Sequence, residues 1–371
     1  MVLKGWKLAA VSILLFGGLS VWCFPEGVEA CTGIMLRNAD GTIVHGRTVE
    51  FAAPVELTMV IVPRGYEFTA KVPGGTGMKY KAKYGAVGTI TFSDLACADG
   101  INEKGLAIGV FYFPAYAKYA KITDENRSKA LSPLDFSNWI LTQFATAEEA
   151  RAAVESGQVV VAPTVLDGWG PEPPPFHYVV YDKTGASIVI EPVEGKLKVH
   201  NNPLGVMTNS PTFDWHMTNL SNYVSLQPLN VPPMDVDGVK LQAFGQGSGL
   251  FGIPGDFTPP SRFVRAAVFS TTAIPASNAD SGIQQVFHIL NNFDIPKGSS
   301  REKDKMGKVY ADYTQWTVAR DPQGLRLYFK SYDDQTVRRV DLKKFDLNVR
   351  DIKKIGMKGT GQVVDLSAEA K

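Results

Sequence analysis

Cys31 is the residue of this chain whose type and position most directly predict chemistry. It follows thirty residues that have the composition of a removable leader. If the chain is cut after Ala30, Cys31 becomes the first residue and carries a thiol nucleophile and a free α-amine together. A thiol has a pKa of ~8.5 and a terminal amine one of ~7.7–8, so near neutral pH the amine can take the thiol proton at small cost. We therefore predict that Cys31 attacks an acyl carbon.

Two charged residues, Arg47 and Glu50, are expected to lie near Cys31. The runs Thr32–Leu36 and Thr42–Thr48 are rich in β-forming residues, and the sequence Asn-Ala-Asp-Gly between them is typical of a hairpin turn. Such a hairpin returns both charged residues to the start of the mature chain. A guanidinium charge beside a thiol favours the thiolate, the nucleophilic form.

Residues 1–30 have the three parts of a secretory signal. Lys4 and Lys7 charge the start, Leu8–Cys23 is mostly apolar, and the small residue Ala30 precedes the expected cut. We expect cleavage there and a periplasmic or secreted mature protein with a single domain over residues 31–371. A retained anchor is disfavoured, because the apolar run is shorter than the ~20 residues that span a bilayer.

A cysteine directly after a cut is also typical of a lipoprotein, in which Cys31 would be lipidated and unable to act as a nucleophile. Glu29 fits such a signal poorly, because small residues are expected beside the lipidated cysteine. This alternative gives a function of another class, a lipid-anchored binding protein without catalysis. The mass of the mature N-terminus separates it from the enzyme.

The composition is that of a globular protein and excludes some classes of function. Of 371 residues, 44% are hydrophobic and 20% are charged, and the formal net charge is +1, so no basic field indicates a nucleic-acid partner. The five histidines lack the spacing of metal ligands, and a Cys–His peptidase would need one of them beside Cys31. The mature chain would hold two cysteines, Cys31 and Cys97, and the nucleophile hypothesis requires both to stay unpaired.

Hairpins alternate with paired helices along the mature chain, which predicts an α+β protein whose sheets are enclosed by helices. Ser132, followed by a proline, predicts a helix over Leu134–Phe144. Thr146 opens a capping box that predicts a second helix over Ala147–Glu155. Residues 228–260 are rich in Gly and Pro and predict an extended loop, either an assembly arm or a pocket lid. Further strands are expected at Val55–Val62, Ala86–Phe92 and Leu106–Phe113, and further helices at Phe213–Val224, Ser261–Thr271 and Ile283–Asn292.

Six stretches in this order resemble the choloylglycine hydrolase family, the group of N-terminal-nucleophile hydrolases that contains penicillin V acylases and bile salt hydrolases. The ordered set covers most of residues 31–270 and is more specific than any one stretch. The stretches are Cys31–Gly33, Gly46–Thr48, Asp99–Leu106, Phe113–Tyr116, Thr208–Phe213, and Pro254–Asp256 with Ser261–Phe263. The resemblance implies a four-layer αββα sandwich, hydrolysis of linear, non-peptide C–N amide bonds, usually a homotetramer, and neither a metal nor an organic cofactor.

Carried over by position, the resemblance implies a site around Cys31 as the nucleophile. Arg47 would lie beside the thiol, and Arg262 would be a second active-site arginine. Asn209 would donate a hydrogen bond to the oxyanion, helped by the backbone N–H of Tyr112. Bile-salt members usually have Asn where Tyr112 stands, and penicillin V members have Tyr, so this chain looks most like the penicillin V acylase type.

Glu50 departs from the family, which usually has Asp there to orient the terminal amine. Glu is one methylene longer and keeps the carboxylate, so it can accept the hydrogen bond of the terminal ammonium if its backbone or rotamer adjusts. The other positions also have structural alternatives. Asn209 could cap the following helix, Arg47 and Arg262 could form surface ion pairs, and Tyr112 could simply pack within a strand.

The expected substrate is a small acyl amide with an aromatic or long apolar acyl group. Penicillin V is the test substrate that the resemblance implies. Related exported members are thought to act on N-acyl homoserine lactones, and bile salt hydrolysis is a further alternative that Tyr112 disfavours. Pocket shape decides among such substrates, and the sequence does not give it.

Overall fold

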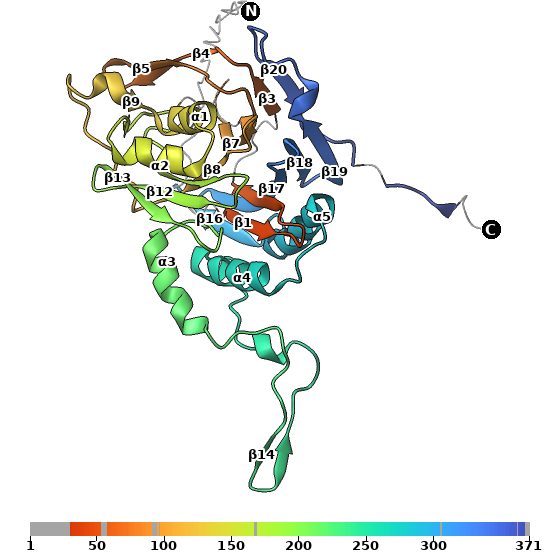
Figure 1. The fold of residues 1–371 in the computed structure, drawn as a ribbon. Coiled ribbons are helices and arrows are strands. Elements are labelled where there is room, and N and C mark those ends of the chain that lie inside the picture. The colour runs from red at the N-terminus through yellow and green to blue at the C-terminus, as the bar shows by residue number, and fades with distance from the viewer. Residues whose placement is uncertain are drawn as a thin grey trace, which may run out of the picture.

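The protein is described by a computed structural model over residues 30–52, 58–90, 95, 97–166, 169–304, 306–361 and 363–367. The predicted leader, residues 1–29, lies outside the described residues, as do the predicted strand ends at 55–57 and 91–92. Two sheets pack face to face, and helices cover both outer faces (Figure 1). The predicted α+β sandwich of four αββα layers is confirmed.

The two sheets are mostly antiparallel meanders. One runs in the order β1-β2-β17-β18-β19, with β16 paired to β17, and the other in the order β13-β12-β11-β8-β7-β6-β3-β20. The strands of the first sheet are β1 (Thr32–Arg37), β2 (Ile43–Phe51), β16 (Ser300–Lys303), β17 (Val309–Asp321), β18 (Arg326–Ser331) and β19 (Asp334–Asp341). The strands of the second are β3 (Thr58–Val62), β6 (Ala86–Ile90), β7 (Cys97–Asn102), β8 (Ala107–Tyr112), β11 (Phe176–Tyr181), β12 (Ser187–Val193), β13 (Lys196–Asn201) and β20 (Lys353–Gly356).

Helices α1 (Pro133–Gln143) and α2 (Ala147–Glu155) cover the second sheet, and α4 (Pro259–Thr272) and α5 (Ala279–Leu290) cover the first (Figure 1). The caps follow the prediction: Ser132 accepts a hydrogen bond from the Asp135 N–H and Thr146 accepts one from the Glu149 N–H. Gly46 allows α5 to lie close to β2, since a Cβ there would be 2.5 Å from Val286 Cγ1.

Apolar side chains fill each interface between layers. Val318 of β17 and Ile61 of β3 belong to the cluster between the sheets. Leu141 of α1 packs in the cluster that includes Ile108 of β8, and Val286 of α5 packs in the cluster under the first sheet. Because β2 is covered on both faces, all nine of its residues are buried, including its charged ones. The sandwich thus carries Arg47 and Glu50 into its interior.

The expected loop at residues 228–260 contains structure that composition did not predict. It forms a hairpin of β14 (Met234–Val236) and β15 (Val239–Leu241), and α4 already begins at Pro259. The hairpin projects away from the body of the molecule (Figure 1), and its strand residues are all exposed.

Other departures are smaller. Helix α3 (Phe213–Leu220) is shorter than predicted and continues as a 3-10 turn. The hairpin of β4 (Glu67–Val72) and β5 (Gly75–Lys81) was not expected. Among the described residues, no helix is long and apolar enough to cross a membrane.

Candidate active site

Cys31 lies directly before β1, with 3% of its surface exposed. Gly33 pairs with Met207 through two backbone hydrogen bonds, of 2.7 and 3.0 Å, and this bridge brings the segment after β13 alongside the start of β1. The Cys31 backbone nitrogen then donates to Asn209 Oδ1 over 2.9 Å. Cys31 and Cys97 form no disulfide with each other, as predicted, and burial raises the pKa of the Cys97 thiol to about 12. Cys97 is therefore an inert core residue.

Arg262 reaches Cys31 from the first turns of α4. Its Nη1 donates to the Cys31 carbonyl and, over 2.9 Å, to Thr32 Oγ1, and its Nη2 donates to Asn209 Oδ1 over 2.7 Å. Burial lowers the pKa of Arg262 to about 10, although the charges of Glu50 and Cys31 oppose this. The guanidinium is therefore cationic at neutral pH, and it is not a surface ion pair.

The side chain of Asn209 is oriented by these bonds. Its Oδ1 accepts from Cys31 and Arg262, while its Nδ2 donates to the Tyr112 carbonyl over 2.9 Å. The next helix, α3, has Thr212 and not Asn209 at its N-cap, so the capping alternative is wrong. The amide nitrogen carries two N–H groups, which leaves a second donor at this position.

The backbone of Tyr112 faces the Asn209 side chain. The next residue, Phe113, points its N–H toward the neighbouring strand β11, where it donates to the Pro175 carbonyl. Tyr112 therefore points its own N–H and C=O to the opposite edge of β8. In an antiparallel strand the N–H and C=O of one residue point to the same edge, so the Tyr112 N–H faces the edge on which its carbonyl meets Asn209. The side chain is 7% exposed and lies beside Trp169, with ring centroids 6.0 Å apart.

Arg47 lies where β7 and β8 separate. Their described pairing ends at Asp99 and Gly109, and Arg47 Nη1 then donates to the carbonyls of Ala98 (3.2 Å) and Val110 (2.5 Å), one in each strand. Its Nε lies 3.6 Å from Asp99, which also pairs with the buried Arg320. Arg47 is thus buried among strand carbonyls and Asp99, and its predicted place beside the thiol stays a prediction.

Glu50 accepts hydrogen bonds from two hydroxyl groups, Thr314 Oγ1 at 2.7 Å and Thr48 Oγ1 at 3.1 Å. The Thr48 hydroxyl in turn accepts from the Thr32 N–H. Burial raises the pKa of Glu50 to about 8, against the charge of Arg262 and the two hydroxyl groups, which lower it. The described hydrogen bond of the Cys31 nitrogen goes to Asn209, so an orienting contact from Glu50 to the amine stays a prediction.

Direct hydrogen bonds therefore join four of the six predicted residues: Cys31, Asn209, Arg262 and, through its backbone, Tyr112. Glu50 is linked to them electrostatically through Arg262. Residue spacing did not reveal Thr314 as a partner of Glu50, because the two residues are 264 positions apart in the chain. No group of three potential metal ligands was found among the described residues.

Comparisons with known proteins identify the family of this chain. Residues 31–355 match the model of the linear amide C–N hydrolases, choloylglycine hydrolase family. The chain belongs to that family. The match begins at Cys31, the residue around which the contacts above are built.

Named relatives include both types of enzyme. A bile salt hydrolase/transferase from Clostridium perfringens is 34% identical over 325 residues, 87% of this chain and 95% of the relative. A penicillin V acylase from Pectobacterium atrosepticum is 27% identical over 86% of this chain and 83% of the relative. The crystal structure of a variant of conjugated bile acid hydrolase from C. perfringens superposes with a TM-score of 0.80 at 32% identity, over 91% of this chain and all of that one. The chain is thus an enzyme of the linear amide hydrolase family.

Proposed function

We propose that this protein is an exported amidase whose nucleophile is the Cys31 thiol, freed by cleavage after Ala30. The observation that carries the proposal is the 2.9 Å hydrogen bond between the Cys31 nitrogen and Asn209 Oδ1. It holds the nitrogen that would become the α-amine beside the amide that would stabilise the oxyanion. The bond from Arg262 to the Cys31 carbonyl supports the same arrangement, because it fixes the other side of the residue.

The reaction follows from these positions. The amine takes the thiol proton, and the thiolate attacks the carbonyl carbon of the amide. The second N–H of Asn209 Nδ2 and the Tyr112 N–H stabilise the oxyanion, and the loss of one such donor typically costs ~10²–10³ in rate. The ammonium protonates the leaving amine as the C–N bond breaks, leaving a thioester. Water, deprotonated by the same amine, hydrolyses the thioester and restores the thiol.

For the acyl group we propose the penicillin V acylase type. Tyr112 supports this choice, and so does the aromatic cluster beside it, in which Trp169 lies 5.3 Å from Phe176 and 5.6 Å from Phe51 between ring centroids. Such rings suit an aromatic acyl group. Bile salt hydrolysis is the second candidate, favoured by the 34% identity to the C. perfringens enzyme. N-acyl homoserine lactones are the natural alternative for an exported member.

The test is to purify the exported protein, measure its N-terminal mass, and assay penicillin V, conjugated bile salts and long-chain N-acyl homoserine lactones. We expect a free Cys31 and turnover that disappears in Cys31→Ala, with Cys97→Ala as the matched control that keeps full activity. A retained leader or a lipidated Cys31 contradicts the mechanism, and lipidation would favour the lipid-anchored binding protein. The ranking of the substrates decides the acyl preference.

The proposal includes a homotetramer, for which the β14–β15 hairpin is the supporting feature. Apolar side chains project from it into solvent, namely Met234, Val236, Val239 and Leu241. An isolated two-stranded hairpin with exposed apolar residues is marginally stable in water, so a second copy of the chain would stabilise it. Replacing residues 233–242 with a short Gly-Ser turn should leave a smaller oligomer by light scattering, with Lys240→Ser as the control. An unchanged mass would exclude the hairpin as the assembly contact.

A further inference from the structure

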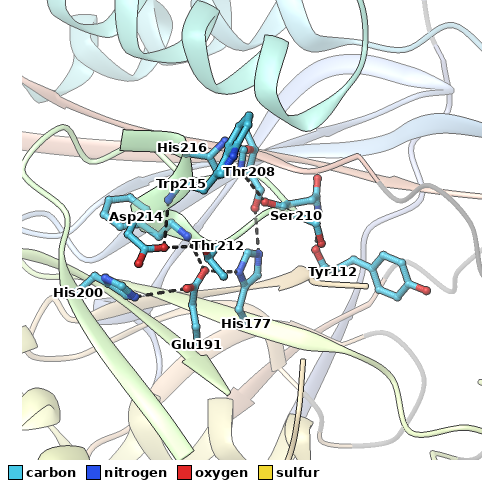
Figure 2. Close-up of polar contacts among 12 residues, drawn as sticks. Tyr112, His177, Glu191, His200, Thr208, Ser210, Thr212, Asp214, Trp215 and His216 are labelled. Carbon is cyan, nitrogen blue, oxygen red and sulfur yellow. Dashed lines mark hydrogen bonds and ion pairs between the residues drawn. The ribbon is translucent and has the colours of Figure 1, made fainter. Parts of the chain in front are cut away.

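A buried polar cluster beside the candidate site has no part in the chemistry proposed above. It contains His177 of β11, Glu191 of β12 and His216 of α3, each at most 1% exposed. Figure 2 shows the His177 ring between the Glu191 carboxylate and the Thr208 carbonyl, with His200 on the other side of Glu191. The cluster is buried, and two of its hydrogen bonds reach the backbone of Thr208 and Asn209, next to the proposed oxyanion donor.

The two histidines bond successive backbone carbonyls. His177 Nε2 lies 3.1 Å from the Thr208 oxygen, and His216 Nε2 lies 2.9 Å from the Asn209 oxygen. A backbone carbonyl only accepts, so both rings carry a proton on Nε2 and donate it. Burial lowers the pKa of His216 to about 4, so this ring is neutral with its proton on Nε2. We call His177 and His216 the histidine clamp.

Each ring of the clamp is fixed by stacking. His177 stacks on Phe113, with ring centroids 4.1 Å apart and an interplanar angle of 12°. His216 stacks on Phe263 at 4.7 Å and 11°. A ring held between aromatic neighbours keeps its Nε2 at a defined point, so the carbonyl that it binds is also held there.

Glu191 connects the two halves of the clamp. Its Oε1 lies 3.2 Å from His177 Nδ1 and accepts a hydrogen bond of 2.9 Å from the Phe213 N–H, at the first residue of α3. Helix α3 carries His216, and a carboxylate at a helix N-terminus is favourable. Burial raises the pKa of Glu191, but the hydrogen bonds and charges of His177 and His200 outweigh it and hold the pKa at about 2. The Glu191 carboxylate thus holds the His177 ring directly, and it holds the His216 ring indirectly by fixing the start of helix α3.

We propose that the histidine clamp positions the Asn209 side chain for catalysis. The carbonyls of Thr208 and Asn209 belong to the peptide planes on either side of the Asn209 Cα, so holding both fixes the direction of its Cα–Cβ bond. The amide then meets Cys31, Arg262 and the Tyr112 carbonyl without reorganising, as a preorganised donor must. The inference rests on the proposed function, in which Asn209 stabilises the oxyanion. His177 and His216 are positioning residues, because they act through Asn209.

The experiment is a double-mutant cycle on the processed enzyme with its best substrate. His216→Leu should lower kcat by about ten- to a hundredfold with KM within about twofold, because the clamp orients a group that acts in the transition state. His216→Gln should restore most of the rate, since its side-chain N–H can reach the same carbonyl. In an Asn209→Ala background, His216→Leu should change kcat by less than about twofold. His288→Leu, at an exposed histidine of α5, is the matched control and should behave as the wild type.

The outcomes distinguish a failure of the histidine clamp from a failure of the proposed function. If His216→Leu costs the same factor in both backgrounds, it does not act through Asn209 and the clamp is wrong. If Asn209→Ala itself turns over at the wild-type rate, the proposed function fails first. Should His216→Leu not fold, Glu191→Gln replaces it in the same cycle, because it keeps the size and an acceptor for the Phe213 N–H while removing the charge. Additive losses for Glu191→Gln and Asn209→Ala would equally overturn the clamp.

Discussion

Two of the residues predicted to form the site are buried arginines, and their partners differ. Arg262, from helix α4, bonds the Cys31 carbonyl and the Asn209 side chain, the groups nearest the proposed reaction. Arg47, from strand β2, bonds strand carbonyls and pairs with Asp99. Their exposed fractions are 1% and 2%, so burial does not distinguish them. The hydrogen-bond partners of a buried arginine, and not its burial, therefore indicate whether it orients groups of the proposed reaction or stabilises the sheet.

Among variants that keep Cys31, the largest expected effect is that of Arg262→Met on turnover. It removes the donor to Asn209 Oδ1 and the donor to the Cys31 carbonyl, so both residues lose their orientation. The loss of one preorganised donor costs ~10²–10³ in rate, and we expect kcat to fall at least that far. Steady-state kinetics on folded protein, checked by circular dichroism, measure it.

Arg262→Lys is the matched variant, because it keeps the charge and loses the fork of donors. We expect it to recover part of the rate and less than half of the lost orders of magnitude. A lysine variant with wild-type kcat would mean that the charge alone matters and that the hydrogen bonds to Asn209 do not.

The second expected effect is on stability, from Arg47→Met. Removing one partner of a buried ion pair typically costs ~3–5 kcal/mol, because the remaining charge is uncompensated. Asp99 keeps Arg320, which places the expected loss in unfolding free energy toward the lower end of that range. Urea denaturation of the purified variant gives the value.

The rate of Cys31 alkylation by iodoacetamide sharpens this test. If Arg47 acts on the sheet alone, the pH midpoint of alkylation should be the same in Arg47→Met and the wild type. A midpoint that rises in the variant would place the guanidinium beside the thiol, as the family resemblance predicts. Both arginines would then act on Cys31, and Arg47 would in addition stabilise the sheet.

What the sequence predicted of this fold was local. The turn before Ile43, the caps at Ser132 and Thr146, and the β1–β2 hairpin depend on a few adjacent residues, and each was found where expected. The contact between Cys31 and Asn209 joins residues 178 positions apart, and no periodicity encodes it. Resemblance to a family supplied Asn209, whereas the hydrogen bond from Thr314 to Glu50 comes from the pairing of β2 with β17, which joins residues 264 positions apart. The β14–β15 hairpin was missed because Gly and Pro masked its short strands.

The third prediction concerns Glu50, a buried carboxyl group whose pKa is raised by burial and lowered by the charges of both arginines. Its pKa is about 8 in the folded protein against an ordinary 4.5, so between these pH values the folded state binds the extra proton. Its contribution to stability is therefore full below about pH 4.5 and is lost as the pH rises through about 8. We expect the unfolding free energy of the wild type to fall relative to that of Glu50→Gln between pH 5 and pH 9. Parallel pH curves for the two proteins would show that Glu50 is already ionised in the folded state.

The smallest expected effect is that of Tyr112→Phe. The groups of Tyr112 that face Asn209 belong to the backbone, and phenylalanine keeps both the carbonyl and the N–H in place. It also keeps the aromatic ring beside Trp169, so we expect kcat for penicillin V within about threefold of the wild type. Tyr112→Asn, which also leaves the backbone intact, should change the ratio of penicillin V to bile salt hydrolysis while the rate on the better substrate survives. A collapse of turnover on every substrate in Tyr112→Phe would mean that the hydroxyl group itself acts in the site, and the oxyanion donors would then have to be assigned again.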